Sequence, residues 1–246
     1  MRTRLPVRAI FFVAVALAGT ASAAITVSSW TYETLTTSDS LDPTGDEATV
    51  ATFNMNGGNA ALGGVNFAGA AAGWYVTNGG ITMAYSVPGS SWAGGASGSF
   101  GSNAVLDSFE LTYPSANGTL EFSGLTVGQE YTFQFIAADQ RAGTDGRRLQ
   151  IFGGTVGGAD VSGSSDQLRF GYQTIAQYAV ISASFTADAS GKAAFLPRVF
   201  AADGVTSLGT QINAIHIMTV PEPTTALLGC FGSFALLLHR RRATNR

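Results

Sequence analysis

The chain holds few side chains that could do chemistry. His216 is the only histidine between residues 24 and 219, and the single cysteine, Cys230, lies in an apolar stretch beyond them. One histidine without a cysteine cannot furnish the usual ligand set of a zinc site. A serine hydrolase needs a hydroxyl beside a base, and no Gly-x-Ser-x-Gly elbow supplies one. In 215–217 the alternation turns His216 away from its isoleucine neighbours, to the surface or between sheets. The sequence therefore predicts that this protein is not an enzyme.

Four acidic residues lie close together early in the chain. Asp39, Asp42, Asp46 and Glu47 offer the hard oxygen ligands that calcium prefers. Their spacing differs from that of an EF-hand loop, and the pattern favours a solvated acidic turn. The sequence thus predicts no cofactor, with calcium as the one candidate. Glycosidases place two carboxyl groups across a cleft, but acids are so numerous here that their presence alone does not indicate such a pair.

Aromatic and charged residues in loop-rich segments are candidate glycan contacts. Exposed rings of Trp74 and Trp92 could stack on pyranose faces, although tryptophan more often fills a core. Trp92 has the least core-like surroundings. Asp139 and Arg141 begin a polar segment that could hydrogen-bond sugar hydroxyls, and internal pairing of its charges is the favoured alternative.

Charge excludes one class of partner. The chain carries 13 Lys and Arg against 16 Asp and Glu, a formal net charge of −3. Seven of the basic residues and one acidic residue lie outside 24–219, which leaves six basic and 15 acidic residues there and a net charge of −9. An acidic domain without a basic stripe repels phosphate backbones, so nucleic acid is not an expected partner.

Short alternating segments separated by glycine, asparagine and serine predict an all-β fold. Apolar residues alternate in 107–113, 119–123 and 129–137, and these three runs predict a meander. Segment 157–166 is expected to be a long loop. Further strands are expected at 149–152, 178–186, 193–196 and 211–218. The many glycine pairs are expected to be turns, and the pattern is typical of an antiparallel sandwich or barrel.

The N-terminus has the layout of a secretory signal peptide. Arg2, Arg4 and Arg8 precede ten apolar residues, and Ala21 and Ala23 supply the small residues of a cleavage site. Cleavage by signal peptidase is expected after Ala23, because the apolar helix is too short to remain a comfortable membrane anchor. The expected organisation is a signal peptide (1–23), one β domain (24–219) and a C-terminal segment (220–246).

The C-terminal segment carries three blocks in order. The triplet Pro221-Glu222-Pro223 stops any preceding strand, because proline lacks a backbone N–H. An apolar run to Leu238 follows, and the cluster Arg240-Arg241-Arg242 closes it as a positive-inside stop. As a helix, 224–238 would be about 22 Å long, short of a hydrocarbon core of about 30 Å. A buried C-terminal helix of the domain is the alternative.

This order of blocks resembles the PEP-CTERM sorting signal of exported bacterial proteins. The resemblance implies transient anchoring in the inner membrane by a short hydrophobic helix and recognition by an exosortase. It further implies cleavage near the Pro-Glu-Pro triplet and release towards the cell surface or an extracellular polysaccharide matrix. Retention of the tail as a membrane anchor stays open.

The β domain carries a second resemblance. Segments 120–135, 139–141, 185–188 and 213–217 resemble a recurring pattern in exported PEP-CTERM proteins, and 59–67 resembles its early part. Such domains are similar to galactose-binding-like jelly rolls, which often serve as carbohydrate-binding modules. The resemblance implies an antiparallel jelly-roll β-sandwich.

Together these observations predict an exported protein of the surface or extracellular matrix that binds polysaccharide. Two alternatives stay open. One is a secreted hydrolase acting on matrix glycans, and the other is a structural coat component without a ligand.

Overall fold

The computed structural model describes the chain between residues 25 and 220, with gaps. The described residues are 25–42, 45, 47–70, 75–85, 90–92, 103–107, 109–112, 118–139, 143–156, 159–171 and 177–220. Every regular element among them is a β-strand, as the sequence predicts, and none is a helix. A helix of the length and apolarity needed to cross a membrane is accordingly not found in this part of the chain. The expected signal-peptide helix and hydrophobic C-terminal helix fall outside it.

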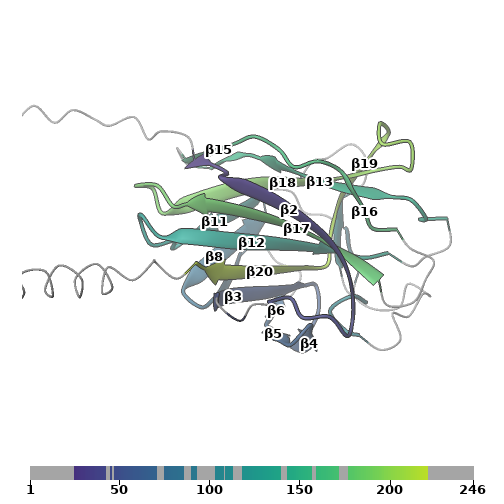
Figure 1. Cartoon of the computed structure of the whole chain (residues 1–246), viewed down its shortest axis with the longest axis horizontal. Coiled ribbons are helices and arrows are strands. Elements are labelled where there is room, and N and C mark those ends of the chain that lie inside the picture. The colour runs from purple at the N-terminus through teal and green to yellow at the C-terminus, as the bar shows by residue number, and fades with distance from the viewer. Residues whose placement is uncertain are drawn as a thin grey trace, which may run out of the picture.

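Two large sheets contain most of the strands (Figure 1). The six-stranded sheet has the order β2 (Ser29–Thr36), β17 (Gln177–Thr186), β12 (Glu130–Ala137), β20 (Ala214–Thr219), β3 (Ala48–Met55) and β6 (Gly69–Ala70). Its neighbours are antiparallel except for β3 and β6, which run parallel.

The nine-stranded sheet follows a similar antiparallel scheme. Its main path is β7 (Tyr75–Asn78), β8 (Ile81–Tyr85), β11 (Leu120–Ser123), β18 (Lys192–Phe200), β19 (Ser207–Ile212), β10 (Phe109–Thr112) and β9 (Ser90–Trp92). Off this path, β13 (Arg148–Gly153) pairs with β18 and with β16 (Leu168–Arg169). Two small sheets complete the described strands: β1 (Ile25–Thr26), β15 (Ala159–Ser162) and β14 (Thr155–Val156), and the hairpin β4 (Ala60–Leu62) and β5 (Val65–Phe67).

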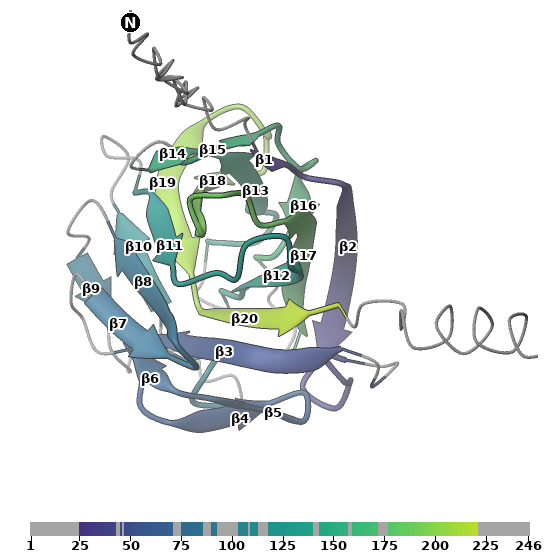
Figure 2. The same ribbon diagram turned by 90° about the vertical axis from the view of Figure 1, so that its left-hand side faces the viewer.

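The main hydrophobic core lies between the two large sheets. Phe122 of β11 meets Phe133 of β12 edge-on, with ring centroids 4.9 Å apart. Phe195 of β18 lies 5.6 Å from Phe133 and 5.1 Å from Phe135. Because tilted and edge-to-face ring pairs stabilise beyond the area they bury, this aromatic cluster ties the sheets together. The sheets therefore pack face to face in a sandwich-like arrangement, and Figure 2 shows them enclosing this interior.

The predicted meander is wrong, although its three strands exist. β10 pairs with β9 and β19, β11 pairs with β8 and β18, and β12 pairs with β17 and β20. Consecutive strands thus lie in opposite sheets or apart in one sheet. The alternation of 119–123 and 129–137 is satisfied because both strands turn their aromatic faces to the shared interior from opposite sides.

The expected strand at 211–218 is two strands in different sheets. β19 ends at Ile212, β20 begins at Ala214, and Asn213 stands between them. The Asn213 side chain accepts from the Ala138 N–H (2.8 Å) and donates to the Leu106 carbonyl (2.9 Å), so it provides partners that a continuous ladder would have provided. The expected loop at 157–166 likewise contains a short strand, β15.

A second, smaller core covers the outer face of the six-stranded sheet. Its buried members are Leu41, Leu62, Phe67, Val105, Leu106, Ile136, Ala138, Tyr178, Val180 and Ala214. The hairpin β4–β5 lies outside β3 in both views (Figures 1 and 2). Gly63 and Gly64 both have positive φ, 56° and 82°, as the two-residue turn of this hairpin requires. This covering layer explains why β12 is buried on both faces after its first residue.

Candidate functional site

The described part of the chain holds one histidine, and it sits in a buried hydrogen-bonded row beneath this covering layer. His216 of β20 points away from Ile215 and Ile217, as the alternation predicts, yet the residue has 0% exposure. Its Nδ1 lies 2.9 Å from Oε1 of Gln134, and its Nε2 lies 2.9 Å from Oγ1 of Thr49. The histidine therefore lies under the second core rather than on the surface.

The row of hydrogen bonds defines the tautomer of the imidazole. The Gln134 Nε2 donates to the Leu41 carbonyl (2.9 Å), so Oε1 of Gln134 is left to accept from Nδ1–H of His216. The other ring nitrogen then accepts from the hydroxyl of Thr49. Burial lowers the pKa of His216 to about 4, and the charge of Asp42 opposes this shift. The ring is neutral and both nitrogens are occupied at neutral pH.

An open depression lies where β3 meets the hairpin β4–β5 and the end of β7. It has a volume of about 590 Å³. The described residues of its lining are uncharged, with three asparagines, two threonines, three alanines and one phenylalanine: Thr49, Thr52, Asn59, Ala60, Ala61, Asn66, Phe67, Ala68 and Asn78. Thr49 connects it to the buried histidine, because its hydroxyl contacts Nε2 of His216.

Two of the lining asparagines are held by backbone N–H groups. The Oδ1 of Asn59 accepts from Gly69 N–H (2.8 Å), and the Oδ1 of Asn78 accepts from Thr52 N–H (3.2 Å). Since a backbone N–H only donates, each amide is oriented with its oxygen inward. Thr52 is also tied down: its hydroxyl accepts from Ala68 N–H and donates to the Asn66 carbonyl. The depression is thus a pre-arranged set of amide groups.

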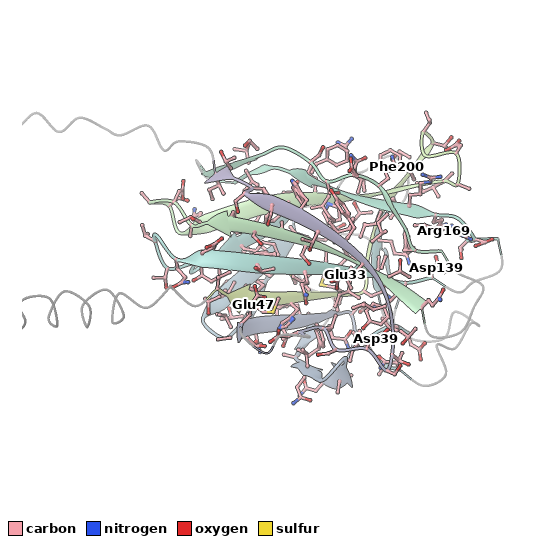
Figure 3. The ribbon with its side chains drawn as sticks, in the orientation of Figure 1. Glu33, Asp39, Glu47, Asp139, Arg169 and Phe200 are labelled. Atoms are coloured by element: carbon pink, nitrogen blue, oxygen red, sulfur yellow. The ribbon has the colours of Figure 1, made fainter. Side chains whose placement is uncertain are left out.

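The proposed calcium ligands do not form a cluster in the described residues. Asp39 accepts from the N–H and hydroxyl of Thr36, which lowers its pKa, and Asp42 accepts from Gly45 N–H. Figure 3 shows Asp39 and Glu47 at separate places beside the sheet.

Glu47 accepts from the hydroxyl of Thr132, and burial raises its pKa. Asp46 lies outside the described residues. No group of three metal-ligating acids, histidines or cysteines occurs in the described ranges.

Asp139, a candidate glycan contact, is a buried partner of an arginine. Its side chain has 0% exposure, and its Oδ2 lies 3.0 Å from Nη1 of Arg147. Arg147 also reaches Oε1 of Gln211 (3.4 Å), whose amide donates to the Ala138 carbonyl. Arg141 lies outside the described residues. Asp139 and Arg147 thus pair within this segment, and Asp145 pairs with Arg169 of β16. Figure 3 shows Arg169 at the outside of the domain.

The side chains of the tryptophan candidates lie outside the described part of the structure. Trp92 is in β9, at the opposite end of the nine-stranded order from β7, and its side chain is outside the description. Trp74 falls outside the described residues, but the next residue, Tyr75, is 77% exposed and is the most exposed aromatic side chain described. The cleavage and sorting residues Ala21, Ala23, Pro221, Glu222, Pro223, Arg240, Arg241 and Arg242 also lie outside.

Sequence reasoning missed the asparagines of the depression. Asn78 precedes Gly79-Gly80, a pair that predicts a hairpin. Asn59 and Asn66 lie on either side of the turn at Gly63-Gly64, Asn59 just before β4 and Asn66 within β5. Such asparagines signal turns in a sequence. Nothing in their local pattern shows that two separate hairpins bring their amides to one strand, β3.

Comparisons with known proteins concern the fold. No protein-family model matches the chain, and no curated protein matches it. A solved structure that is similar to it is that of the plant receptor-like kinase ANX2, with a TM-score of 0.51 and 10% sequence identity. The match covers 71% of this chain and 49% of that one, so this chain spans about half the length of its neighbour. At this identity the likeness shows a shared all-β fold alone.

Proposed function

We propose that this chain is an exported surface or extracellular-matrix protein whose β domain binds polysaccharide without cleaving it. The observation that carries the proposal is the open depression beside β3. Its volume of about 590 Å³ is in the range of small-ligand sites. Amide and hydroxyl groups from Asn59, Asn66, Asn78 and Thr49 can hydrogen-bond sugar hydroxyls, while the ring of Phe67 and three alanines offer apolar surface to the C–H faces of a sugar.

The environment of the histidine supports a binding role over a catalytic one. A general base must reach the proton that it removes. The imidazole of His216 is buried, and both of its nitrogens are engaged by Gln134 and Thr49. Burial also lowers its pKa to about 4, which makes it a weak base at neutral pH. Its place in the fold is that of a structural support beneath the depression.

The export route remains part of the same proposal. The signal peptide, the Pro-Glu-Pro triplet and the arginine cluster support translocation, transient inner-membrane anchoring and processing by signal peptidase and an exosortase. We also propose a jelly-roll topology for the sandwich. The pairing of β2 with β17 and of β12 with β20, strands far apart in the sequence, supports this topology.

Asn66→Ala is expected to weaken polysaccharide binding about tenfold or less, the effect of losing one or two net hydrogen bonds. The residue lines the depression and is exposed, and its side chain supports no described turn, so the melting temperature should stay the same. The measurement is affinity for a panel of neutral and acidic polysaccharides, with an assay for reducing ends run in parallel.

The matched control is Val205→Ala, which shortens a side chain that is 80% exposed on the turn between β18 and β19. It should leave binding unchanged. Binding without new reducing ends is the expected result. Polysaccharide cleavage that one carboxylate substitution abolishes would contradict the proposal, as would a folded chain that binds no polysaccharide.

Protein recovered from the cell surface is expected to lack both ends of the chain. Intact mass should correspond to an N-terminus at Ala24 and a C-terminus near the Pro-Glu-Pro triplet. The control is the same protein from cells without exosortase activity, which should keep the tail and stay with the membrane. Surface protein that still carries Arg240, Arg241 and Arg242 would contradict the proposed processing.

A further inference from the structure

None of the described residues that line the depression is ionisable. These nine residues are asparagines, threonines, alanines and one phenylalanine. Uncharged sites recognise a ligand by hydrogen bonds and apolar contact, and hydrogen-bonding sites reject analogues that leave buried polar groups unpaired.

Asn59 and Asn78 offer hydrogen-bond donors to a ligand. Their oxygens are engaged by Gly69 N–H and Thr52 N–H, so the groups that remain for a ligand are the two Nδ2 amides. Nothing in the described residues accepts a hydrogen bond from either of these amides. Thr49 offers the complementary group, because its hydroxyl hydrogen is directed to His216 and its oxygen lone pairs remain.

The surroundings disfavour a negatively charged ligand. Amide donors alone could also donate to a carboxylate, but no lysine or arginine is among the described residues that line the site. Asp42 and Glu47 belong to the connection that leads into β3, the strand of Thr49 and Thr52. Residues 24–219 carry a net charge of −9, and a field of this sign repels anions.

From these features we infer that the depression selects an uncharged sugar over a uronate or a sulfated sugar. Hydroxyl, ring or acetamido-carbonyl oxygens accept from the amides of Asn59 and Asn78, and a sugar hydroxyl donates to Thr49. This selectivity rests on the proposed polysaccharide-binding function and names the ligand class for it.

Asn59→Asp and Asn78→Asp test the donors while keeping the fold. Aspartate is isosteric with asparagine and keeps the oxygen that Gly69 N–H or Thr52 N–H requires, but it removes the N–H₂ group. The intact chain, held in a non-glycosidic detergent, is measured against dextran, mannan, galactan and chitin oligosaccharides. Carboxymethyl-dextran, alginate and polygalacturonate provide the anionic arm, with dextran and carboxymethyl-dextran as a matched pair.

The wild-type chain is expected to bind at least one neutral ligand at least tenfold more tightly than any anionic one. Its affinity should change little between low and high salt. Each Asp variant should lose tenfold or more in affinity at an unchanged melting temperature, and Val205→Ala should lose nothing.

The outcomes separate this inference from the function on which it rests. Anionic ligands that bind as tightly as neutral ones, or neutral binding that survives both Asp substitutions in a folded chain, would overturn the selectivity and leave polysaccharide binding in place. A folded wild-type chain that binds neither arm would overturn both.

Discussion

Asn213→Ala is expected to lower the free energy of unfolding by about 2–6 kcal/mol, because it leaves two buried backbone groups unpaired at about 1–3 kcal/mol each. The Ala138 N–H and the Leu106 carbonyl both bond to the Asn213 side chain, at 2.8 and 2.9 Å. Alanine offers neither donor nor acceptor, and the site has 0% exposure. Since domains are stable by only about 5–15 kcal/mol, this single change removes a large share.

The measurement is denaturant unfolding of wild type and variant. Their midpoints are compared where the free energy of unfolding depends equally steeply on denaturant concentration in both. Asn66→Ala is the matched control, because it removes the same side chain from an exposed position and should stay within about 0.5 kcal/mol of wild type. A midpoint for Asn213→Ala that coincides with that of Asn66→Ala would show that the switch between β19 and β20 does not depend on the asparagine.

Acidification from pH 6.5 to pH 4 is expected to remove about 3 kcal/mol of stability through His216 alone. Burial lowers its pKa from 6.5 to about 4 in the folded state. Well above pH 6.5 the imidazole is neutral in both states, so it causes no pH dependence there. Below that pH the imidazole is protonated in the unfolded chain but stays neutral in the folded chain. The free energy of unfolding therefore falls until the pH reaches the folded-state pKa.

The pH window between 7 and 5 isolates this effect. His216 is the only histidine in residues 24–219. Most carboxylates titrate lower, and Glu47, whose pKa burial raises, acts with the opposite sign as the pH falls. The readout is the free energy of unfolding against pH for wild type, His216→Gln and Glu47→Gln. The fall in stability should disappear in His216→Gln, where only the opposite contribution of Glu47 remains, and it should persist in Glu47→Gln. An unchanged fall in His216→Gln would assign it to another group.

The inward faces of the strands could be predicted because side chains alternate with a period of two residues. Phe133 and Phe135 share the core face of β12, as the alternation in 129–137 indicates. The turn at Gly63 and Gly64 could be predicted too, since a two-residue hairpin needs two positive φ angles. These features depend on neighbours within a few residues.

Pairing could not be predicted in the same way. The pattern of 119–123 and 129–137 fits either a hairpin or two strands that face each other across a core, because both arrangements bury the same side. The aromatic contact of Phe122 in β11 with Phe133 in β12, strands of different sheets, shows the second arrangement. Likewise, the run 211–218 contains no glycine or proline that would mark a strand end, and only the contacts of Asn213 with two distant segments divide it.

By itself the sequence determined the all-β class, the net charge of the domain and the apolar faces of its strands, because composition and a two-residue period are local properties. Only the tertiary structure decided which strands meet, why His216 is buried rather than exposed, and how the amides of Asn59 and Asn78 come to line one depression. The physical reason is that an alternating strand specifies which of its faces avoids water but not what covers that face. In this chain the cover comes from hairpins and connections far away in the sequence.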